Sequence, residues 1–246
     1  MEVNEFEIPV PWGYIAAKSW GSNKNKLVLM VHGLRDNAGS FDRLIKYLPK
    51  HFYYLCIDLP GHALSSYFPQ NIPINILNYV MALRLVIENT KRKKLIIIGH
   101  SWGGMLSALF TQLYPEVIEK IVLLDSVYSH PISVQYFKQF TKQHLETVKT
   151  LFEKSSKSTS PVYSYKDILK LIMRNRLYGT LNRDAAEAIL KRSSMQVGND
   201  LYVLRNYGHL RIKHYLFADM EFVVKIVKCV PSHVPSYFYS LRSRPL

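Results

Sequence analysis

Residues 95–110 read LIIIGHSWGGMLSALF, and this stretch decides the fold. It begins as an apolar run typical of a buried strand, passes through the Gly-x-Ser-x-Gly pattern of residues 99–103, and continues as a helical pattern rich in small residues. A serine on a tight strand-to-helix turn needs glycines around it, because a Cβ atom there would clash. The pattern predicts that the Ser101 hydroxyl stands clear of a sheet, with helix amides behind it.

A second motif follows the apolar run KLVLMVH of residues 26–32, where Gly33 and Leu34 come next. The loop after such a strand supplies one amide to an oxyanion site, here the amide of Leu34, and the residue after the serine supplies the other. We therefore predict an oxyanion hole formed by the amides of Leu34 and Trp102. The residues expected to line the pocket around it are His32, Gly33 and His100. Taken alone, His32 and Gly33 would indicate only a strand-ending turn.

Apolar runs alternate with helical patterns over the first half of the chain, which is typical of a parallel sheet with crossover helices. An antiparallel lead-in over residues 5–10 and 14–19 comes first. We expect an α/β fold with a mostly parallel sheet. Its predicted elements are strands 26–32, 52–58, 95–98 and 120–124, and helices 40–48, 76–89 and 102–114.

The pattern changes after about residue 129, where helices are expected without strands. The predicted helices are 134–152, 165–174 and 183–192, the last with Asn182 as its N-cap. A helical insertion behind a parallel sheet is a natural lid over the carboxyl ends of the strands. The predicted organisation is a core over residues 1–128, a helical cap over 129–220 and a partial return to the core over 221–246.

Four segments carry a resemblance to a known family: VHGLRDNAGSFDRLIKYLP (31–49), DLPGHALSS (58–66), GHSWGG (99–104) and VLLD (122–125). They resemble α/β-hydrolase fold proteins and, more narrowly, the serine hydrolase-like proteins of animals, insects included. The resemblance is firm over residues 10–126 and looser through the helical region. It implies an eight-stranded, mostly parallel sheet and a Ser-His-acid triad for ester-type hydrolysis, with Ser101 as the nucleophile.

The histidine of such a triad is difficult to find. It must take the proton of the serine, and the resemblance implies that it follows the last strand. Residues 221–228 favour a helix, and residues 229–240 stand where a seventh strand is expected, although Pro231 and Pro235 weaken that strand. A further strand, its histidine loop and a final helix do not fit into the remaining residues. We therefore expect a sheet that lacks its last strand and helix.

The other candidate triad partners stay open. Asp125 follows the strand of residues 120–124 at the correct edge of the sheet, either as the acid or as a loop cap. His209 mimics a loop histidine but falls before the helix that precedes the seventh strand, and His100 is too close to Ser101 in sequence to face it. Asp36 and Asp42 are expected to order a loop and cap a helix, and Asp58, which ends an earlier strand on the wrong side of the serine, is expected to be structural. Two hypotheses follow: a serine hydrolase of small carboxylic esters or related acyl compounds, or a truncated or degenerate hydrolase that only binds a ligand.

The composition limits the partners. Lys and Arg number 32 against 18 Asp and Glu, which gives a net charge of +14, but the basic residues are spread out and no nucleic-acid motif accompanies them. We expect a small-molecule ester or acyl substrate and no nucleic acid, and the sequence leaves the oligomeric state open. No His or Cys pair has the spacing of metal ligands, so no metal or cofactor is expected.

The location follows from the cysteine content and the amino terminus. The 246 residues contain two cysteines, the first residues are acidic where a signal peptide is basic, and no apolar run nears the about 20 residues of a membrane span. We expect an intracellular, cytoplasmic protein without stable membrane insertion. A peroxisomal or vesicle-associated location is the alternative.

Overall fold

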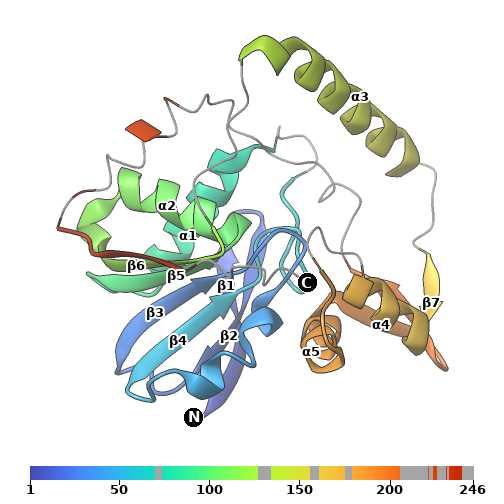
Figure 1. The fold of residues 1–246 in the computed structure, drawn as a ribbon. Helices are drawn as coiled ribbons and strands as arrows, with labels where there is room; N and C mark the ends of the chain where they lie inside the picture. Colours follow the sequence, from blue (N-terminus) through green and yellow to red (C-terminus); the bar gives the residue numbers. More distant parts are fainter. Residues whose placement is uncertain are drawn as a thin grey trace.

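The chain folds around one large sheet with a smaller sheet beside it (Figure 1). A computed structural model describes residues 1–69, 74–126, 134–155, 161–174, 179–205, 221, 224–225, 231 and 233–239. Over these residues the large sheet has seven strands: β1 (Val3–Val10), β2 (Gly13–Trp20), β3 (Lys26–Val31), β4 (Phe52–Ile57), β5 (Leu95–His100), β6 (Ile118–Leu124) and β10 (Ser236–Tyr239).

The large sheet has the order β1-β2-β4-β3-β5-β6-β10. β1 pairs with β2, and β2 with β4, in antiparallel register, whereas every later pair is parallel. β5 therefore lies inside the sheet between β3 and β6, so the carboxyl ends of these three strands meet at one edge. The predicted α/β fold with a mostly parallel sheet is confirmed.

Two helices cover one face of this sheet (Figure 1). α1 (Ile76–Asn89) begins at Asn75, whose side chain accepts a hydrogen bond from the Leu77 amide and forms a capping box with Asn78. α2 (Trp102–Leu113) follows β5 directly. Both helices bury large side chains against the strands, and these include Tyr79, Leu83, Val86, Leu106 and Phe110. This packing fixes the start of α2 at the carboxyl edge of the sheet.

The helix predicted over residues 40–48 does not form. Two short 3₁₀ helices stand there instead, η1 (Ala38–Phe41) and η2 (Ile45–Tyr47). Asn37 caps η1 by accepting from the Gly39 amide, whereas Asp42, expected as a cap, forms an ion pair with Lys18 at 2.9 Å. A glycine and a local Asn cap favour a tight turn over an extended helix, which explains the difference.

Residues 162–204 form a small unit of their own. It contains α4 (Tyr165–Arg174), α5 (Arg183–Ser193) and a three-stranded antiparallel sheet in the order β7-β9-β8. The strands are β7 (Val162–Ser164), β8 (Ser194–Gly198) and β9 (Leu201–Leu204). The prediction of helices without strands in this region is therefore wrong. The strands are short and half-exposed, so their sequences lack the alternation that a core-facing strand shows.

The helix predictions in this region agree better with the structure. α4 matches the predicted range, α5 extends one residue further, and the Asn182 side chain accepts from the Ala185 amide as its N-cap. α3 (Phe137–Ser155) follows a 3₁₀ turn and stands apart from the small unit (Figure 1). Most of the helix predicted over 221–228 lies outside the described residues. None of the helices in the described ranges combines the length and apolar character needed to cross a bilayer.

Candidate active site

Ser101 occupies the turn between β5 and α2 in a backbone conformation that residues other than glycine rarely adopt. Its φ is +50° and its ψ is −120°. The Ser101 amide donates a hydrogen bond of 3.0 Å to the Leu124 carbonyl, which ties the turn to the end of β6. Such a conformation costs on the order of 1–3 kcal/mol and persists where the surroundings fix it. The half-buried serine therefore stands on a strained corner at the carboxyl edge of the sheet.

Two glycines allow the backbone to pack closely around this corner. A Cβ atom on Gly99 would lie 2.5 Å from the Gly104 Cα, which is shorter than the contact distance between two carbon atoms. A Cβ atom on Gly103 would lie 2.3 Å from the His32 carbonyl oxygen. The start of α2 can therefore approach β5 and the end of β3 only because these positions lack side chains.

The loop after β3 lies directly against Ser101. A Cβ atom on Gly33 would lie 3.3 Å from the Ser101 Cβ, so the loop backbone borders the serine. Leu34, the next residue, is half-buried against the core, and Trp102, the first residue of α2, is 7% exposed. Amides of a loop and of a helix N-terminus beside a serine are the donors that stabilise a developing oxyanion.

His32 lies beneath this loop and makes hydrogen bonds with both ring nitrogens. Its side chain is fully buried, Nδ1 donates to the Gly33 carbonyl at 2.7 Å, and Nε2 accepts from the Leu59 amide at 2.9 Å. Burial lowers the pKa of His32 to about 3. The neutral ring holds the loop of Gly33 in place, and neither nitrogen is available to Ser101.

His62 is a second buried histidine next to the first. The two ring centroids are 5.0 Å apart, and the His62 ring lies 6.1 Å from the Trp102 ring. Its Nδ1 donates to the Pro60 carbonyl at 3.0 Å, and burial lowers its pKa to about 3. Its Nε2 is buried and makes no hydrogen bond within the described part of the chain. No local pattern in the sequence indicates this buried pair.

His100 faces the same loop from the other side. Its Nδ1 lies 4.0 Å from Asp36 Oδ2, and a Cβ atom on Gly33 would lie 3.1 Å from that nitrogen. The His100 side chain is 37% exposed and that of Asp36 is 6% exposed. The structure therefore brings His100, Gly33 and Ser101 together at one point of the sheet edge.

Asp125 follows β6 at the same edge. Its backbone has φ +47°, and its amide donates to the Tyr239 carbonyl of β10 at 2.7 Å. The residue is exposed. The Leu124 carbonyl accepts a hydrogen bond from the Ser101 amide, and Asp125 is the next residue along the chain. Asp125 therefore lies close to the turn that carries Ser101.

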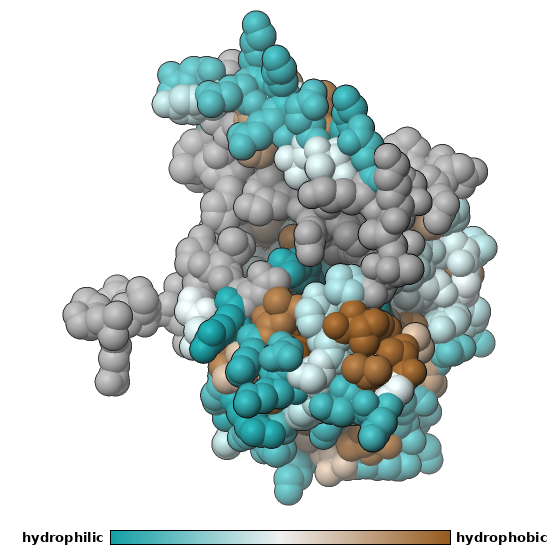
Figure 2. All heavy atoms as spheres, turned by 90° about the vertical axis from the view of Figure 1, so that its right-hand side faces the viewer, coloured by the Kyte–Doolittle hydropathy of each residue, from teal (hydrophilic) through white to brown (hydrophobic). Residues whose placement is uncertain are grey.

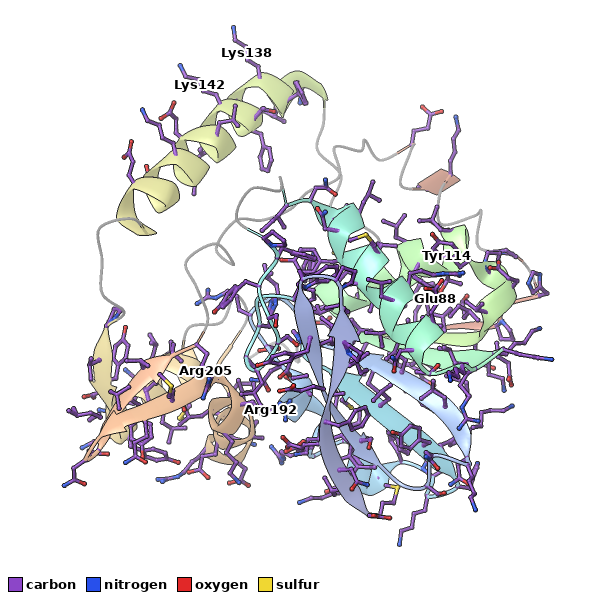
Figure 3. The ribbon with its side chains drawn as sticks, turned by 180° about the vertical axis from the view of Figure 1, so that it is seen from behind. Glu88, Tyr114, Lys138, Lys142, Arg192 and Arg205 are labelled. Carbon is purple, nitrogen blue, oxygen red and sulfur yellow. The ribbon has the colours of Figure 1, made fainter. Side chains whose placement is uncertain are left out.

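Asp58, at the end of β4, has a structural role, because its carboxylate is held by backbone amides and an arginine. Its carboxylate accepts from the amides of Ala38 at 2.8 Å and Leu64 at 3.2 Å, and from Arg192 Nη2 at 2.9 Å. Arg192, on α5, is 4% exposed and also lies 2.8 Å from Glu5 of β1 (Figure 3). This buried ion pair joins the small unit to the large sheet. Nothing in the sequence distinguished Arg192 from the exposed Lys191 beside it.

A histidine partner for Ser101 is not among the described contacts. Within the described residues, no hydrogen bond joins Ser101 Oγ, or the Asp125 carboxylate, to a histidine. His209 lies outside the described residues. In the same ranges, no three His, Cys, Asp or Glu side chains gather as a metal site.

A cavity of about 550 Å³ opens at the opposite edge of the sheet. Its lining includes Leu27 and Tyr53, the second residues of β3 and β4, together with Glu2 and Arg92. None of the candidate site residues lines this cavity. It is therefore separate from the corner that carries Ser101.

Comparison with known protein families gives a match over most of the chain. The sequence model described as "alpha/beta hydrolase fold" matches residues 26–240. The chain is 34% identical to "Serine hydrolase-like protein 2" of Homo sapiens, over 94% of this chain and 74% of that protein. It is 32% identical to "Probable serine hydrolase" of Drosophila melanogaster, over 76% of this chain and 56% of that protein. Both relatives are longer than the match.

Solved structures agree with this match. A hypothetical protein from Pseudomonas aeruginosa PAO1 aligns over 95% of this chain and 80% of its own, with a TM-score of 0.84 and 26% identity. A thioesterase domain from the curacin biosynthetic pathway aligns over 97% of this chain and 82% of its own, with a TM-score of 0.76. At 18% identity, the second likeness concerns the fold alone.

Proposed function

Since this chain belongs to the alpha/beta hydrolase fold family, we propose that it is a serine hydrolase that cleaves a small carboxylic ester or a related acyl compound. The observation that carries the proposal is the strained backbone of Ser101, bordered by the Gly33 loop and the start of α2. A serine is held in such a backbone conformation, at a cost in energy, where its hydroxyl has to reach a substrate.

In this proposal Ser101 Oγ attacks the carbonyl carbon of the ester. The negative charge that develops on the carbonyl oxygen is stabilised by the amides of Leu34 and Trp102, aided by the positive end of α2. The alcohol departs with the proton that Oγ loses, and water then releases the acid from the acyl-enzyme. Asp125 is the proposed acid, and Gly33, His100 and, from below, His32 shape the pocket.

The predicted domain organisation completes the proposal. Residues 1–128 and 221–246 would form the catalytic core and its return. Residues 129–220, with their own small sheet, would form the cap that selects the acyl group. The buried pair of Asp58 and Arg192 supports a fixed position for α5 against that core.

A second candidate is a degenerate hydrolase that binds a ligand without turnover. It is favoured by one observation: within the described residues, no histidine is bonded to Ser101 Oγ, and His32 and His62 are held by the backbone. A serine hydroxyl without a general base is a weak nucleophile at neutral pH.

A fluorophosphonate probe separates the two candidates. We expect one equivalent of label on Ser101, measured by intact mass and peptide mapping, and hydrolysis of a p-nitrophenyl ester. Ser101→Ala should abolish both, whereas Ser22→Ala, an exposed serine at the opposite edge of the sheet, should leave both unchanged. A folded wild-type protein that takes up no label would favour the binding protein.

A further inference from the structure

α3 presents a basic stripe to solvent. Lys138, Lys142 and Lys149 are all exposed and lie at positions i, i+4 and i+11, so they share one face of the helix over about 16 Å. Figure 3 shows Lys138 and Lys142 pointing away from the rest of the molecule. The same helix forms the hydrophilic top of the molecule in Figure 2. This stripe is available to a partner.

Exposure on α3 is not confined to the stripe. Phe140 is half-buried, whereas Thr147, on the side of the helix opposite Lys138, is exposed like the three lysines. Two exposed glutamates flank the stripe, Glu146 four residues after Lys142 and Glu153 four residues after Lys149, so the charge of the face is positive but not uniform. The stripe agrees in sign with the whole chain, whose net charge is +14, and an anionic partner is therefore attracted at long range before it meets α3.

An apolar side chain stands among these lysines. Leu145, at position i+7, is 60% exposed between Lys142 and Lys149. Tyr136 and Phe137, just before and at the start of the helix, are 57% and 47% exposed, beside the stripe and not on it. A phosphate backbone offers such groups little to contact, whereas the boundary between lipid headgroups and acyl chains accommodates both the apolar groups and the lysine stems.

We propose that the outer face of α3 docks on an anionic phospholipid bilayer, with Lys138, Lys142 and Lys149 on the headgroups and Leu145 at the boundary with the acyl chains. The binding is peripheral, because the helix lies along the surface and does not cross it.

The test measures vesicle binding and needs no turnover, so its outcome is independent of the proposed hydrolase activity. The full chain is sedimented with vesicles of phosphatidylcholine alone or of phosphatidylcholine with about 30% phosphatidylserine. This share of anionic lipid reproduces the negative surface potential of a cytoplasmic leaflet. We expect binding only to the anionic vesicles and its loss as salt is raised. Each lysine near such a surface contributes about five-fold in partitioning, so Lys138→Gln, Lys142→Gln and Lys149→Gln combined should weaken binding about 100-fold.

Two further variants keep the proposal falsifiable. Lys91→Gln, Lys93→Gln and Lys94→Gln combined remove the same charge from the exposed loop before β5 and should change binding little. Leu145→Gln should weaken vesicle binding about ten-fold through lost apolar contact. Equal unfolding midpoints show that each variant is folded.

Three outcomes would overturn the proposal. The first is absence of binding to anionic vesicles. The second is a larger loss of vesicle binding in the loop variant than in the α3 variant. The third is lysine-dependent binding to a short RNA or DNA duplex, unaffected by Leu145→Gln, from a chain that does not bind vesicles.

Discussion

Arg192 and the lysines of α3 belong to the same stretch between β6 and β10, yet they occupy opposite environments. Arg192 is 4% exposed and bonded to a carboxylate that is itself fully buried, whereas Lys138, Lys142 and Lys149 face solvent. One cation therefore holds the small unit on the sheet, and the others remain free to meet something outside the chain. The net charge of a sequence does not tell these roles apart, because it counts both kinds equally.

The largest expected effect is a loss of folding stability at low pH. It tests whether the two buried histidines beneath the Ser101 loop stay neutral in the folded chain. His32 and His62 keep a pKa of about 3 in the folded chain because they are buried, but they take up protons near pH 6.5 when unfolded. The unfolded chain thus binds more protons between pH 6.5 and 3, so stability falls as pH falls. The slope reaches about 2.7 kcal/mol per pH unit for two groups.

Urea unfolding at pH 7.0, 6.0 and 5.0 measures this slope, in a window above the titration of ordinary carboxylates. His62→Gln should remove about half of it, since one proton fewer is taken up. An unchanged slope would show that His62 does not stay neutral in the folded chain.

Arg192→Met tests the buried side of the comparison directly. The variant leaves the Asp58 carboxylate buried without its cation, and breaking a buried pair in this way costs about 3–5 kcal/mol. Thermal unfolding should show a fall of roughly 6–20 °C for a chain of this size. The double variant Arg192→Met, Asp58→Asn should recover part of the loss, and a fully additive result would deny that the two side chains are coupled.

Gly39→Ala probes the packing that accompanies this ion pair. A Cβ atom on Gly39 would lie 2.3 Å from the Ala188 carbonyl oxygen of α5, so the helix must shift away from η1. We expect a loss of about 1–3 kcal/mol in urea unfolding. The matched change Gly198→Ala meets only the flexible end of Leu201 at 3.2 Å and should cost less. Similar losses for both would place α5 further from η1 than described.

Asn182→Ala is the smallest change expected to be measurable. It removes the N-cap of α5 and the 2.9 Å hydrogen bond that Arg43 donates to the Asn182 side chain, for a loss of about 1 kcal/mol. Arg183→Ala, next to it, removes only an exposed pair with Glu187 and should cost less than Asn182→Ala does. Equal losses of stability in the two variants would indicate that the N-cap of α5 contributes no more than the exposed ion pair.

The sequence predicted best where local chemistry and tertiary contact agree. α1 was predicted to its exact bounds because its apolar residues recur at helical spacing. The corner at Ser101 was predictable because glycines at 99, 103 and 104 leave few conformations other than a tight turn between strand and helix.

The sequence failed where a contact comes from far along the chain. The pairing of Arg192 with Asp58, and the buried contact of His32 with His62, depend on segments that no local pattern brings together. β8 and β9 are joined across Asn199 and Asp200, a turn that stabilises two short strands without any apolar alternation. η1 is shaped by α5, which follows much later in the sequence.

The position of β10 has a consequence for how the molecule is made. β10 pairs with β6, but residues 125–235 separate the two strands, so during synthesis on the ribosome the outer edge of β6 emerges long before the strand that covers it. An uncovered parallel edge is a place where nascent chains stick to one another. Chaperone contact during translation should therefore concentrate on β6 and end when residue 239 leaves the exit tunnel.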